Sequence, residues 1–385
     1  MNTDHETFNL IKDLSNTFGP SGFEDDVTKL AKNWIEDSAP EAASYIVEDK
    51  LRNLYVFRKG NSEERAAGFG KVYTDSLEND SETDGQRPVL MLDAHSDEVG
   101  LMVQSIRPNG LMEFITLGSW SPANFPSSKV WIRAEDGRLV SGIVANKPPH
   151  FQTAADRNKP LSVEDMVIDI GATSAQEVRE QFHIEVGCPA CPAVEFEYCE
   201  ENQVALGKAF DDRIGCAVVL ESLRRLQGEK LAVDVIGTLT SQEEVGERGC
   251  IAAVKKVNPD IAICVEGAPA DDTFMPEYNI QNGMHRGPMM RCMDVCMITH
   301  PRFIRYAFKV ADELGIPTQR AVRRGGGTNG GAIHTYGDIP CIVISCPVRY
   351  PHSHHSYTAL DDFEKTVQLV CELLRRLDQE TVGTF

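Results

Sequence analysis

Residues 238–249 read TLTSQEEVGERG and place two adjacent glutamates directly after an apolar run. The preceding residues 231–239 predict a buried strand, and Gly246 predicts a loop that turns toward a helix. In open α/β sheets, ligands bind just beyond the carboxyl ends of the strands, where Glu243 and Glu244 are expected to lie. One carboxylate can then hold a metal while the other handles a proton. An isolated Glu-Glu pair is more often a solvated acidic turn, so the interpretation depends on the residues at the ends of the other strands.

Alternating strands and helices precede and follow this stretch. Apolar runs at 88–94, 260–266 and 339–345 predict further buried strands. Helical periodicity is found near both termini and between these strands, in the ranges 5–18, 24–39, 213–226, 301–314 and 360–377. The pattern predicts an α/β fold: a mixed, largely parallel sheet sandwiched by helices. The polar, glycine-containing segment 60–87 predicts an irregular, exposed excursion.

The segment 99–207 has a different texture, because short β-type runs replace the helices. Asn109-Gly110 and Asp136-Gly137 are typical of two-residue hairpin turns. We therefore expect an inserted β-rich domain at 99–207, which divides a catalytic domain into 1–98 and 208–385. The apolar residues Phe114, Ile115, Leu117 and Trp120 predict an exposed surface on which copies of the chain associate.

Composition excludes several classes of function. The formal charge of −20 over 385 residues argues against nucleic-acid partners, which need clustered Lys and Arg. No apolar run approaches the ~18 residues of a membrane span, and the first residues lack the features of a signal peptide. The 11 cysteines stand mostly in apolar runs and predict reduced thiols, so we expect a cytoplasmic protein. Cys188 and Cys191 have no second Cys-x-x-Cys pair and are interpreted as incidental thiols.

Metal-capable side chains follow or end five of the apolar runs. Each one alone would more often be structural, but together on one sheet edge they predict a metal site. Imidazole and carboxylate ligands suit Zn²⁺, Co²⁺ or Mn²⁺, and their number suffices for two ions that share a bridging carboxylate. The candidates are His95, Asp211, Glu243 with Glu244, Glu266 and His352.

Four motifs around these residues resemble, in order, those of the tetrahedral (TET-type) dinuclear metallo-aminopeptidases, which are similar to glutamyl aminopeptidase and include proteins labelled endoglucanase M. They are AHSDEVG at 94–100, KAFDDRIG at 208–215, SQEEVG at 241–246 and RYPHS at 349–353. The resemblance covers nearly the whole chain, including an inserted β domain.

The resemblance implies a role for each candidate. Asp211 would bridge two metals, His95 and Glu266 would complete one site, and Glu244 and His352 the other. Glu243 would be the general base for a water that the metals share, and Asp97 would hold the His95 imidazole from behind. Of the three histidines at 352, 354 and 355, His352 keeps the family's spacing from the strand at 339–345, so the resemblance favours His352 as the ligand.

The chain departs from the family pattern at two positions, where the family commonly has aspartate. Glu266 keeps a carboxylate with one more methylene, and Asn329 removes a charge and puts the substrate preference in doubt. Asn329 ends a glycine-rich stretch that lacks the Lys-Ser/Thr ending of a phosphate-binding loop. We expect this stretch to form a flexible wall that binds substrate through Gly326, Gly327, Thr328 and Asn329. Arg323 and Arg324 would meet an acidic substrate side chain or simply be solvated.

These observations predict an aminopeptidase that releases N-terminal residues from short peptides, with two divalent ions per subunit. The resemblance implies a homo-oligomer, from a dimer to a dodecamer. Two alternatives stay open: a metal-dependent deacylase of small N-acylated compounds and a non-catalytic oligomeric scaffold. A glycosidase needs two carboxyl groups that face each other across a sugar, which the adjacent Glu243 and Glu244 do not provide by themselves.

Overall fold

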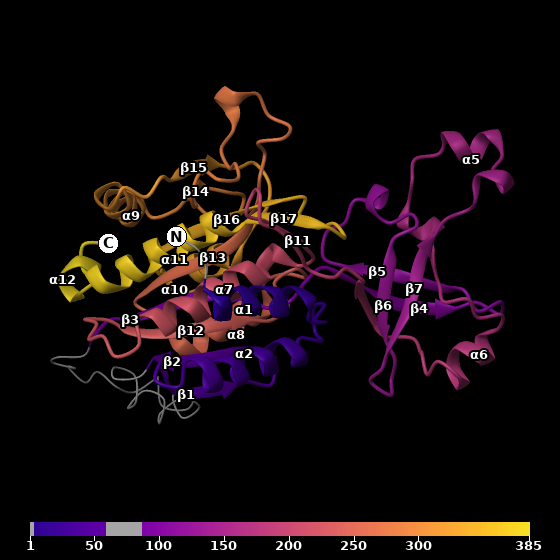
Figure 1. Cartoon of the computed structure of the whole chain (residues 1–385), viewed down its shortest axis with the longest axis horizontal. Helices are drawn as coiled ribbons and strands as arrows, with labels where there is room; N and C mark the ends of the chain where they lie inside the picture. Colours follow the sequence, from indigo (N-terminus) through magenta and orange to yellow (C-terminus); the bar gives the residue numbers. More distant parts are fainter. Residues whose placement is uncertain (1–3, 59–86) are drawn as a thin grey trace.

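The computed structural model describes residues 4–58 and 87–385 and contains a large α/β body with a smaller β-barrel beside it (Figure 1). The predicted excursion at 60–87 lies, except for its last residue, outside the described residues. In the part of the chain that is described, no helix is both long and apolar enough to cross a membrane.

One mixed sheet, with eleven strands among the described residues, forms the α/β body. Its four central strands are parallel, as predicted, and lie in the order β12 (Asp234–Thr240), β3 (Val89–His95), β13 (Ile261–Pro269) and β16 (Cys341–Arg349). Mostly antiparallel strands extend both flanks, so the sheet is more mixed than the strand and helix alternation indicated. These are β1 (Ala43–Glu48), β2 (Leu54–Arg58), β10 (Glu197–Cys199), β11 (Val204–Gly207), β14 (Met289–Met293), β15 (Gln319–Val322) and β17 (Ser356–Ala359).

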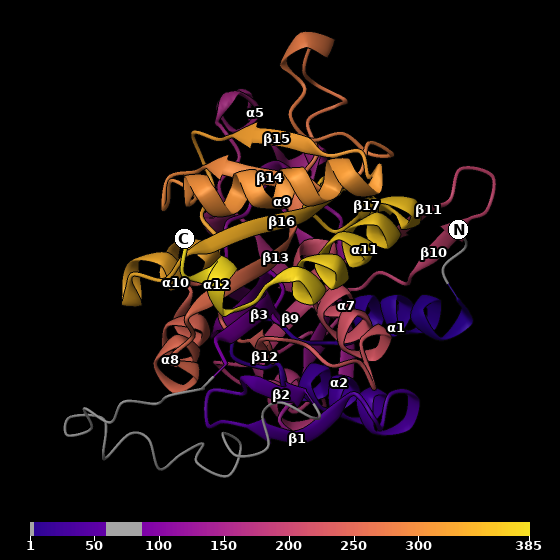
Figure 2. The same cartoon turned by 90° about the vertical axis from the view of Figure 1, so that its left-hand side faces the viewer.

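Helices cover both faces of this sheet (Figure 2). Because side chains alternate along a strand, Leu90 and Leu92 of β3 join the core on one face, whereas Val89 and Met91 join the core on the other. The first core includes α1 (His5–Asn16), α2 (Asp25–Ser38), α7 (Phe210–Arg225), α9 (Pro301–Leu314) and α11 (Leu360–Arg376). The second includes α8 (Arg248–Val257) and α10 (Asn329–Gly337). A short helix, α12 (Gln379–Val382), follows α11.

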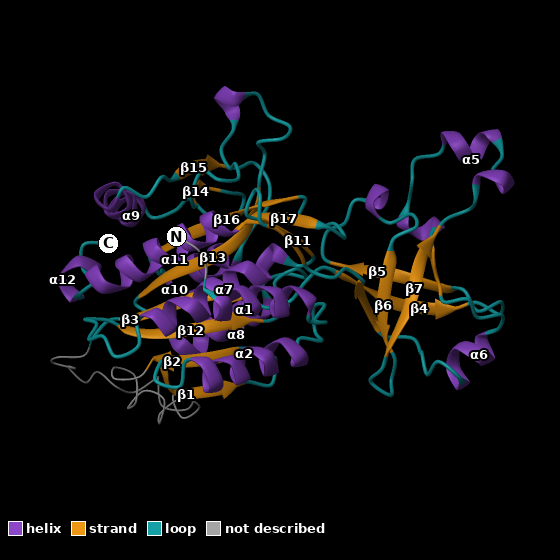
Figure 3. Ribbon diagram, viewed as in Figure 1, coloured by secondary structure: helices purple, strands orange, loops and turns teal. Residues whose placement is uncertain are grey.

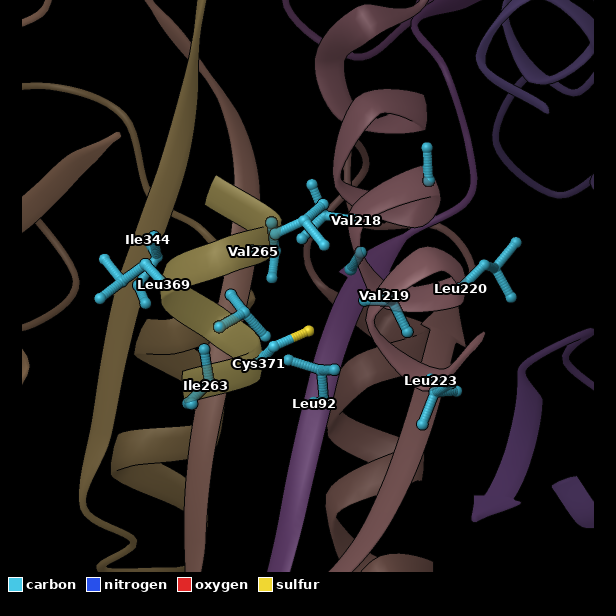
Figure 4. Packing of buried hydrophobic residues seen from close by; sticks show 14 of the residues in the cluster. Leu92, Val218, Val219, Leu220, Leu223, Ile263, Val265, Ile344, Leu369 and Cys371 are labelled. Atoms are coloured by element: carbon cyan, nitrogen blue, oxygen red, sulfur yellow. The ribbon is translucent and has the colours of Figure 1, made fainter. Parts of the chain in front are cut away.

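The larger core fixes the central strands against α7 and α11. Figure 4 shows Leu92, Ile263 and Ile344 of the strands beside Val219 of α7 and Leu369 of α11. All five side chains are fully buried. Truncating a leucine in such a core to alanine costs about 2–5 kcal/mol. The ends of these strands are therefore held in a rigid frame.

The second body is a closed barrel, visible apart from the sheet in Figure 3. Around the barrel the strand order is β4 (Gly100–Ile106), β5 (Met112–Leu117), β8 (Val167–Asp169), β7 (Leu139–Ala145), β6 (Lys129–Arg133) and β9 (Pro189–Pro192). Both predicted hairpin turns are present, at Gly110 between β4 and β5 and at Gly137 between β6 and β7, and both glycines have positive φ. Two short helices, α5 (Ala154–Asn158) and α6 (Ala175–Glu180), accompany it.

Two details differ from the expectations for the insert. Strands β10 and β11 fall inside the predicted range 99–207 but pair in the large sheet, through β17. The expected exposed run is partly wrong, because Phe114 is buried in the barrel core and Trp120 packs on Phe125. Ile115, 45% exposed, does face outward. Whether 99–207 acts as a separate oligomerisation domain stays a prediction.

A buried ion pair joins the segment that leads into the barrel to the segment that follows β11. Glu98 precedes the barrel, Lys208 follows it, and the Lys208 ammonium donates to the Glu98 carboxylate at 2.6 Å. Both side chains are fully buried, and Arg213 lies 3.5 Å from the same carboxylate. Breaking a buried pair of this kind costs about 3–5 kcal/mol. The pair therefore fixes the start of α7 against the end of β3, and both of these elements carry candidate metal ligands.

Candidate metal centre

The carboxyl ends of the parallel strands bring the predicted ligands together. His95 is the last residue of β3, and its register partner Thr240 ends β12 just before Glu243 and Glu244. Glu266 lies within β13, Asp211 lies in the first turn of α7, and His352 follows β16. Five separate elements thus converge on one edge of the sheet, as ligand sites of open α/β sheets do.

Asp211 stands between the two histidines. Its Oδ1 lies 3.1 Å from His95 Nε2, and its Oδ2 lies 3.1 Å from His352 Nε2. Each oxygen of this one carboxylate therefore faces a different imidazole. That is the arrangement a carboxylate needs to bridge two ions, each of which also takes one histidine.

The two outer carboxylates divide between the same two histidines. Glu266 Oε1 lies 3.5 Å from His95 Nε2, whereas Glu244 Oε1 lies 3.3 Å from His352 Nε2. The buried Glu266 Oε2 has no hydrogen-bond partner among the described residues. Glu243 Oε2 lies farther from His95 Nε2, at 3.9 Å. The geometry thus groups the ligand candidates into two sets and sets Glu243 apart from them.

Asp97 holds this arrangement from behind. Its Oδ1 lies 3.3 Å from His95 Nδ1, and Ser21 donates its hydroxyl to Oδ2 at 2.6 Å. The same carboxylate accepts the backbone N–H groups of Glu243 and Glu244, at 2.9 and 3.2 Å. One fully buried side chain therefore orients an imidazole and also the loop that carries both glutamates.

The charges at the site are unbalanced without cations. Burial raises the pKa of Glu266 to about 7, and the nearby Asp211 adds to the shift. Burial likewise raises the pKa of Glu243 well above its usual value, with repulsion from Glu266 and Glu244. Burial alone would lower the pKa of His352, but Asp211 and Glu244 outweigh it and raise the value to about 11. Carboxylates held this close favour a bound cation.

The neighbouring histidines have other surroundings. His354 is buried against Trp120 and Phe125, and its ring nitrogens lack hydrogen-bond partners among the described residues. Burial lowers its pKa to about 4, so this ring is a neutral packing group. His355 is exposed. His352 alone of the three meets the predicted carboxylates, and its Nδ1 lies 2.8 Å from the Ser119 carbonyl oxygen.

A cavity of about 570 Å³ opens over the site. The predicted Gly326, Gly327 and Thr328 line it, together with Arg291, Arg323, Arg324, Glu247 and Cys296. Asn329, also predicted to bind substrate, is not among the lining residues. Its buried amide donates to Asp93 Oδ2 and Thr240 Oγ1, at 2.8 and 2.7 Å, so it supports the strand ends from below.

Sequence reasoning missed several groups around the site. Asp212 accepts the backbone N–H of His95 at 3.1 Å and that of Gly215 at 3.0 Å, so it ties β3 to α7. Asp212 could have been identified from the sequence, because it directly follows Asp211. The Ser119 carbonyl oxygen could not, because every residue type has a backbone carbonyl. Cys188 and Cys191 are buried free thiols in the barrel, away from the cavity lining.

Comparison with known proteins places this geometry in a family. The model for "M42 glutamyl aminopeptidase" matches residues 79–369. The putative aminopeptidase FrvX of Escherichia coli (strain K12) is 29% identical over 98% of this chain and 97% of its own. The glutamyl aminopeptidase of Lactococcus lactis subsp. cremoris (strain MG1363) is 28% identical over 98% of both chains.

A solved structure agrees over the same length. The TET aminopeptidase from the marine sediment archaeon Thaumarchaeota archaeon SCGC AB-539-E09 superimposes with a TM-score of 0.87 at 37% identity, and the match covers 98% of this chain and 99% of that one. The resemblance seen in the four sequence motifs is thereby confirmed. This chain belongs to the M42 glutamyl aminopeptidase family of peptidases.

Proposed function

We propose that this aminopeptidase releases N-terminal residues from short peptides with the help of two divalent metal ions. The observation that carries the proposal is the Asp211 carboxylate, whose two oxygens each lie 3.1 Å from a different histidine. A non-catalytic scaffold would not need a carboxylate between two histidines, nor the Glu243 carboxylate beside them.

The residues present fit two ions. His95 and Glu266 would hold one ion, His352 and Glu244 the other, and Asp211 both. Two groups of side chains have ligand atoms within 4.8 Å of one another, namely His95 with Asp211 and Glu244, and His95 with Asp212 and Glu266. These groups omit His352 and include Asp212, but we assign Asp212 no ion because it already accepts the backbone N–H groups of His95 and Gly215. Mixed imidazole and carboxylate sets suit Zn²⁺, Co²⁺ or Mn²⁺. Such ions polarise a scissile carbonyl and make water more acidic.

Glu243 would act as the general base. Its carboxylate reaches the cavity but stands back from the ligand cluster, 3.9 Å from His95 Nε2. It would take the proton from the attacking water and return it to the departing amine. Asp97 would keep Glu243 in place through the backbone N–H bond of 2.9 Å, and it would hold His95 in one orientation.

Release of free amino acids from unblocked peptides tests the proposal. Protein purified without chelator should contain about two divalent ions per chain and cleave peptides with a free N-terminus, but not their N-acetylated forms. Removal of the metals should abolish turnover, and adding Zn²⁺, Co²⁺ or Mn²⁺ should restore it. Preferential cleavage of the acetylated compounds would favour the deacylase instead.

We also propose that copies of the chain associate through the barrel. On the outer surface of the barrel, Ile115 is 45% exposed and Ile143 is 47% exposed. Phe151, in the segment between β7 and α5, is 72% exposed. Apolar side chains at these positions lose contact with water when two barrels pack together. In an isologous contact of this kind, the same barrel surface of each copy would pack against that of its partner.

The thiols support a cytoplasmic location. All 11 cysteines are free, and seven of the eight that are buried lie in the hydrophobic cores. Free thiols in this number are typical of reducing compartments. Fractionation of cells that produce the protein would test the location.

A further inference from the structure

One carboxylate in the cavity has no part in the proposed metal chemistry. Glu247 follows Glu244 by three residues and lines the same cavity. Its own N–H and that of Gly246 both donate to the Glu243 carbonyl at 2.9 Å, and this tight turn returns the chain toward the site. Its side chain is half-buried.

Glu247 lacks a cationic partner. Within residues 4–58 and 87–385, no ion pair or hydrogen bond of its carboxylate is found, and its charged neighbour Asp294 repels it. Burial and this repulsion raise its pKa. Arg291 is already bound to Asp294 at 3.0 Å, and Arg323 to Asp271 at 2.9 Å. A half-buried, unpaired carboxylate therefore faces the space where a substrate would lie.

Two side chains of the cavity wall, those of Glu247 and Cys296, lie close to Gly327. A Cβ placed at Gly327 would lie 3.1 Å from Glu247 Oε1 and 2.6 Å from Cys296 Sγ. Glycine at 327 thus lets Cys296 and Glu247 pack directly against the backbone, so that a thiol and a carboxylate lie beside each other in the cavity wall. A long unbranched chain with a positive end matches these surfaces, because its methylenes would contact Cys296 and its charge would meet Glu247.

The one cavity arginine without an ion pair among the described residues is a weaker determinant. Arg324 lines the cavity and is exposed. Exposed charges interact weakly, because water screens them. Glu247 lies partly out of water, where the same charge acts more strongly.

We propose that Glu247 makes this aminopeptidase prefer peptides whose first residue is lysine or arginine. The proposal rests on the proposed function, since it names the side chain that the same cavity accepts. A charge-assisted hydrogen bond from the substrate ammonium or guanidinium would satisfy the carboxylate.

The experiment compares p-nitroanilides of lysine, arginine, norleucine and glutamate, with the metal-loaded full chain. Norleucine has an unbranched chain close to that of lysine without the charge, so the lysine-to-norleucine ratio of kcat/KM isolates the cation. We expect a wild-type ratio of ~10 or more, and a fall of at least ~10-fold in Glu247→Gln. Glu247→Lys should shift the preference toward glutamate. An unchanged ratio in Glu247→Gln overturns the proposal, including the case in which all substrates lose activity equally.

Two further measurements complete the test. Arg324→Met should keep or raise the ratio, since it removes a like charge, and a fall in this variant would also overturn the proposal. Calorimetric binding of lysinamide should weaken in Glu247→Gln relative to norleucinamide, which reports recognition without turnover. Wild-type protein that cleaves peptides without a cation preference contradicts this inference alone, whereas protein that cleaves none contradicts the proposed function.

Discussion

At the scale of single residues, two adjacent glutamates are proposed to do different chemistry. Both leave β12 on the same loop, and Asp97 accepts the backbone N–H of each. Their carboxylates then diverge, because Glu244 Oε1 lies 3.3 Å from His352 and Glu243 approaches His95 only to 3.9 Å. The difference is in side-chain direction, so substitution at each position should have a separate effect.

Glu243→Gln should reduce kcat by ~10²- to 10⁴-fold while the metal content stays at the wild-type level, because the amide keeps the shape but cannot accept a proton. Glu244→Gln is the matched control. It should lose part of the metal, and its activity should recover partly in excess metal. Metal analysis beside kcat measures both. If Glu244→Gln lost turnover with full metal content while Glu243→Gln remained active, the two roles would be reversed.

The histidines at 352 and 354 offer a second matched pair. His352→Ala should lose one of two ions and more than ~100-fold in activity, since an ion in such a site stabilises charge by several kcal/mol. His354→Leu should keep both ions, because the neutral ring that it replaces makes only packing contacts, with Trp120 and Phe125. Metal analysis decides, and loss of an ion in His354→Leu would show that the wrong histidine was chosen.

Residue types and spacing were sufficient to predict the residues that the fold brings together. Histidine and carboxylates at strand ends carry their chemistry in their side chains, so His95, Glu244 and His352 could be proposed from sequence. Asn329 could not be placed, because nothing local shows that its amide turns inward to Asp93. The side chain of Glu247 could not be placed either, since only the folded loop shows that it lacks a partner.

At the scale of elements, the buried strands were the most predictable part. β3 and β16 are continuous apolar runs and are almost completely buried, as parallel strands between two helix layers must be. The outer strands could not be assigned to this sheet from the local sequence pattern. β10 and β11 lie in a segment of β texture, but their partner β17 is about 150 residues away, and pairing over that distance leaves no mark in the local sequence.

The hydrogen bonds of Asp49 link the turn between β1 and β2 to α8, and they make a pH-dependent contribution to stability. Asp49, in the turn between β1 and β2, accepts hydrogen bonds from Tyr55 at 2.8 Å, from Asn53 at 3.0 Å and from Lys256 of α8. Burial alone would raise the pKa of Asp49, but these donors lower it below the usual 3.8. A carboxyl with a lowered pKa in the folded state stabilises the fold above its unfolded-state pKa, and this contribution is lost as the pH falls below it.

Lys256→Met should therefore lower the free energy of unfolding by ~1 kcal/mol at pH 7, a value discounted because the Lys256 side chain is 32% exposed. The difference from wild type should persist down to about pH 4 and narrow only as the pH falls below 3.8 toward the lowered pKa of folded Asp49, because the carboxylate then becomes protonated. Urea unfolding at pH 7, 4 and 2.5 measures the difference. A gap that stays constant down to pH 2.5 would mean that packing, rather than charge, accounts for the effect.

At the scale of the whole molecule, the barrel and the α/β body are fixed to each other rather than loosely linked. The buried pair of Glu98 and Lys208 holds the segment that leads into the barrel against the start of α7. His352, a proposed ligand on the α/β body, contacts the Ser119 carbonyl oxygen, which follows β5 of the barrel. A partner bound to the barrel would therefore be held at a fixed position relative to the body that carries the metal centre.

The outer surface of the barrel should hold copies of the chain together. Ile115 of β5 and Ile143 of β7 are nearly half exposed, whereas their neighbours Phe114 and Val144 lie in the barrel core. A stable interface buries roughly 800 Å² on each partner, and apolar side chains at its centre supply most of the affinity. We expect the wild-type protein to sediment as a dimer or a larger assembly at micromolar concentration.

The double variant Ile115→Asp, Ile143→Asp should shift the protein toward monomers, because two carboxylates at the centre of an isologous contact each meet their own copy or its apolar surroundings. Circular dichroism and metal content should stay unchanged, since both side chains point away from the core. Tyr278→Asp is the control, because this tyrosine is 90% exposed but lies on a loop of the α/β body. If wild-type protein were monomeric, or if Tyr278→Asp dissociated the assembly and the barrel variant did not, the barrel would not be the surface that joins the copies.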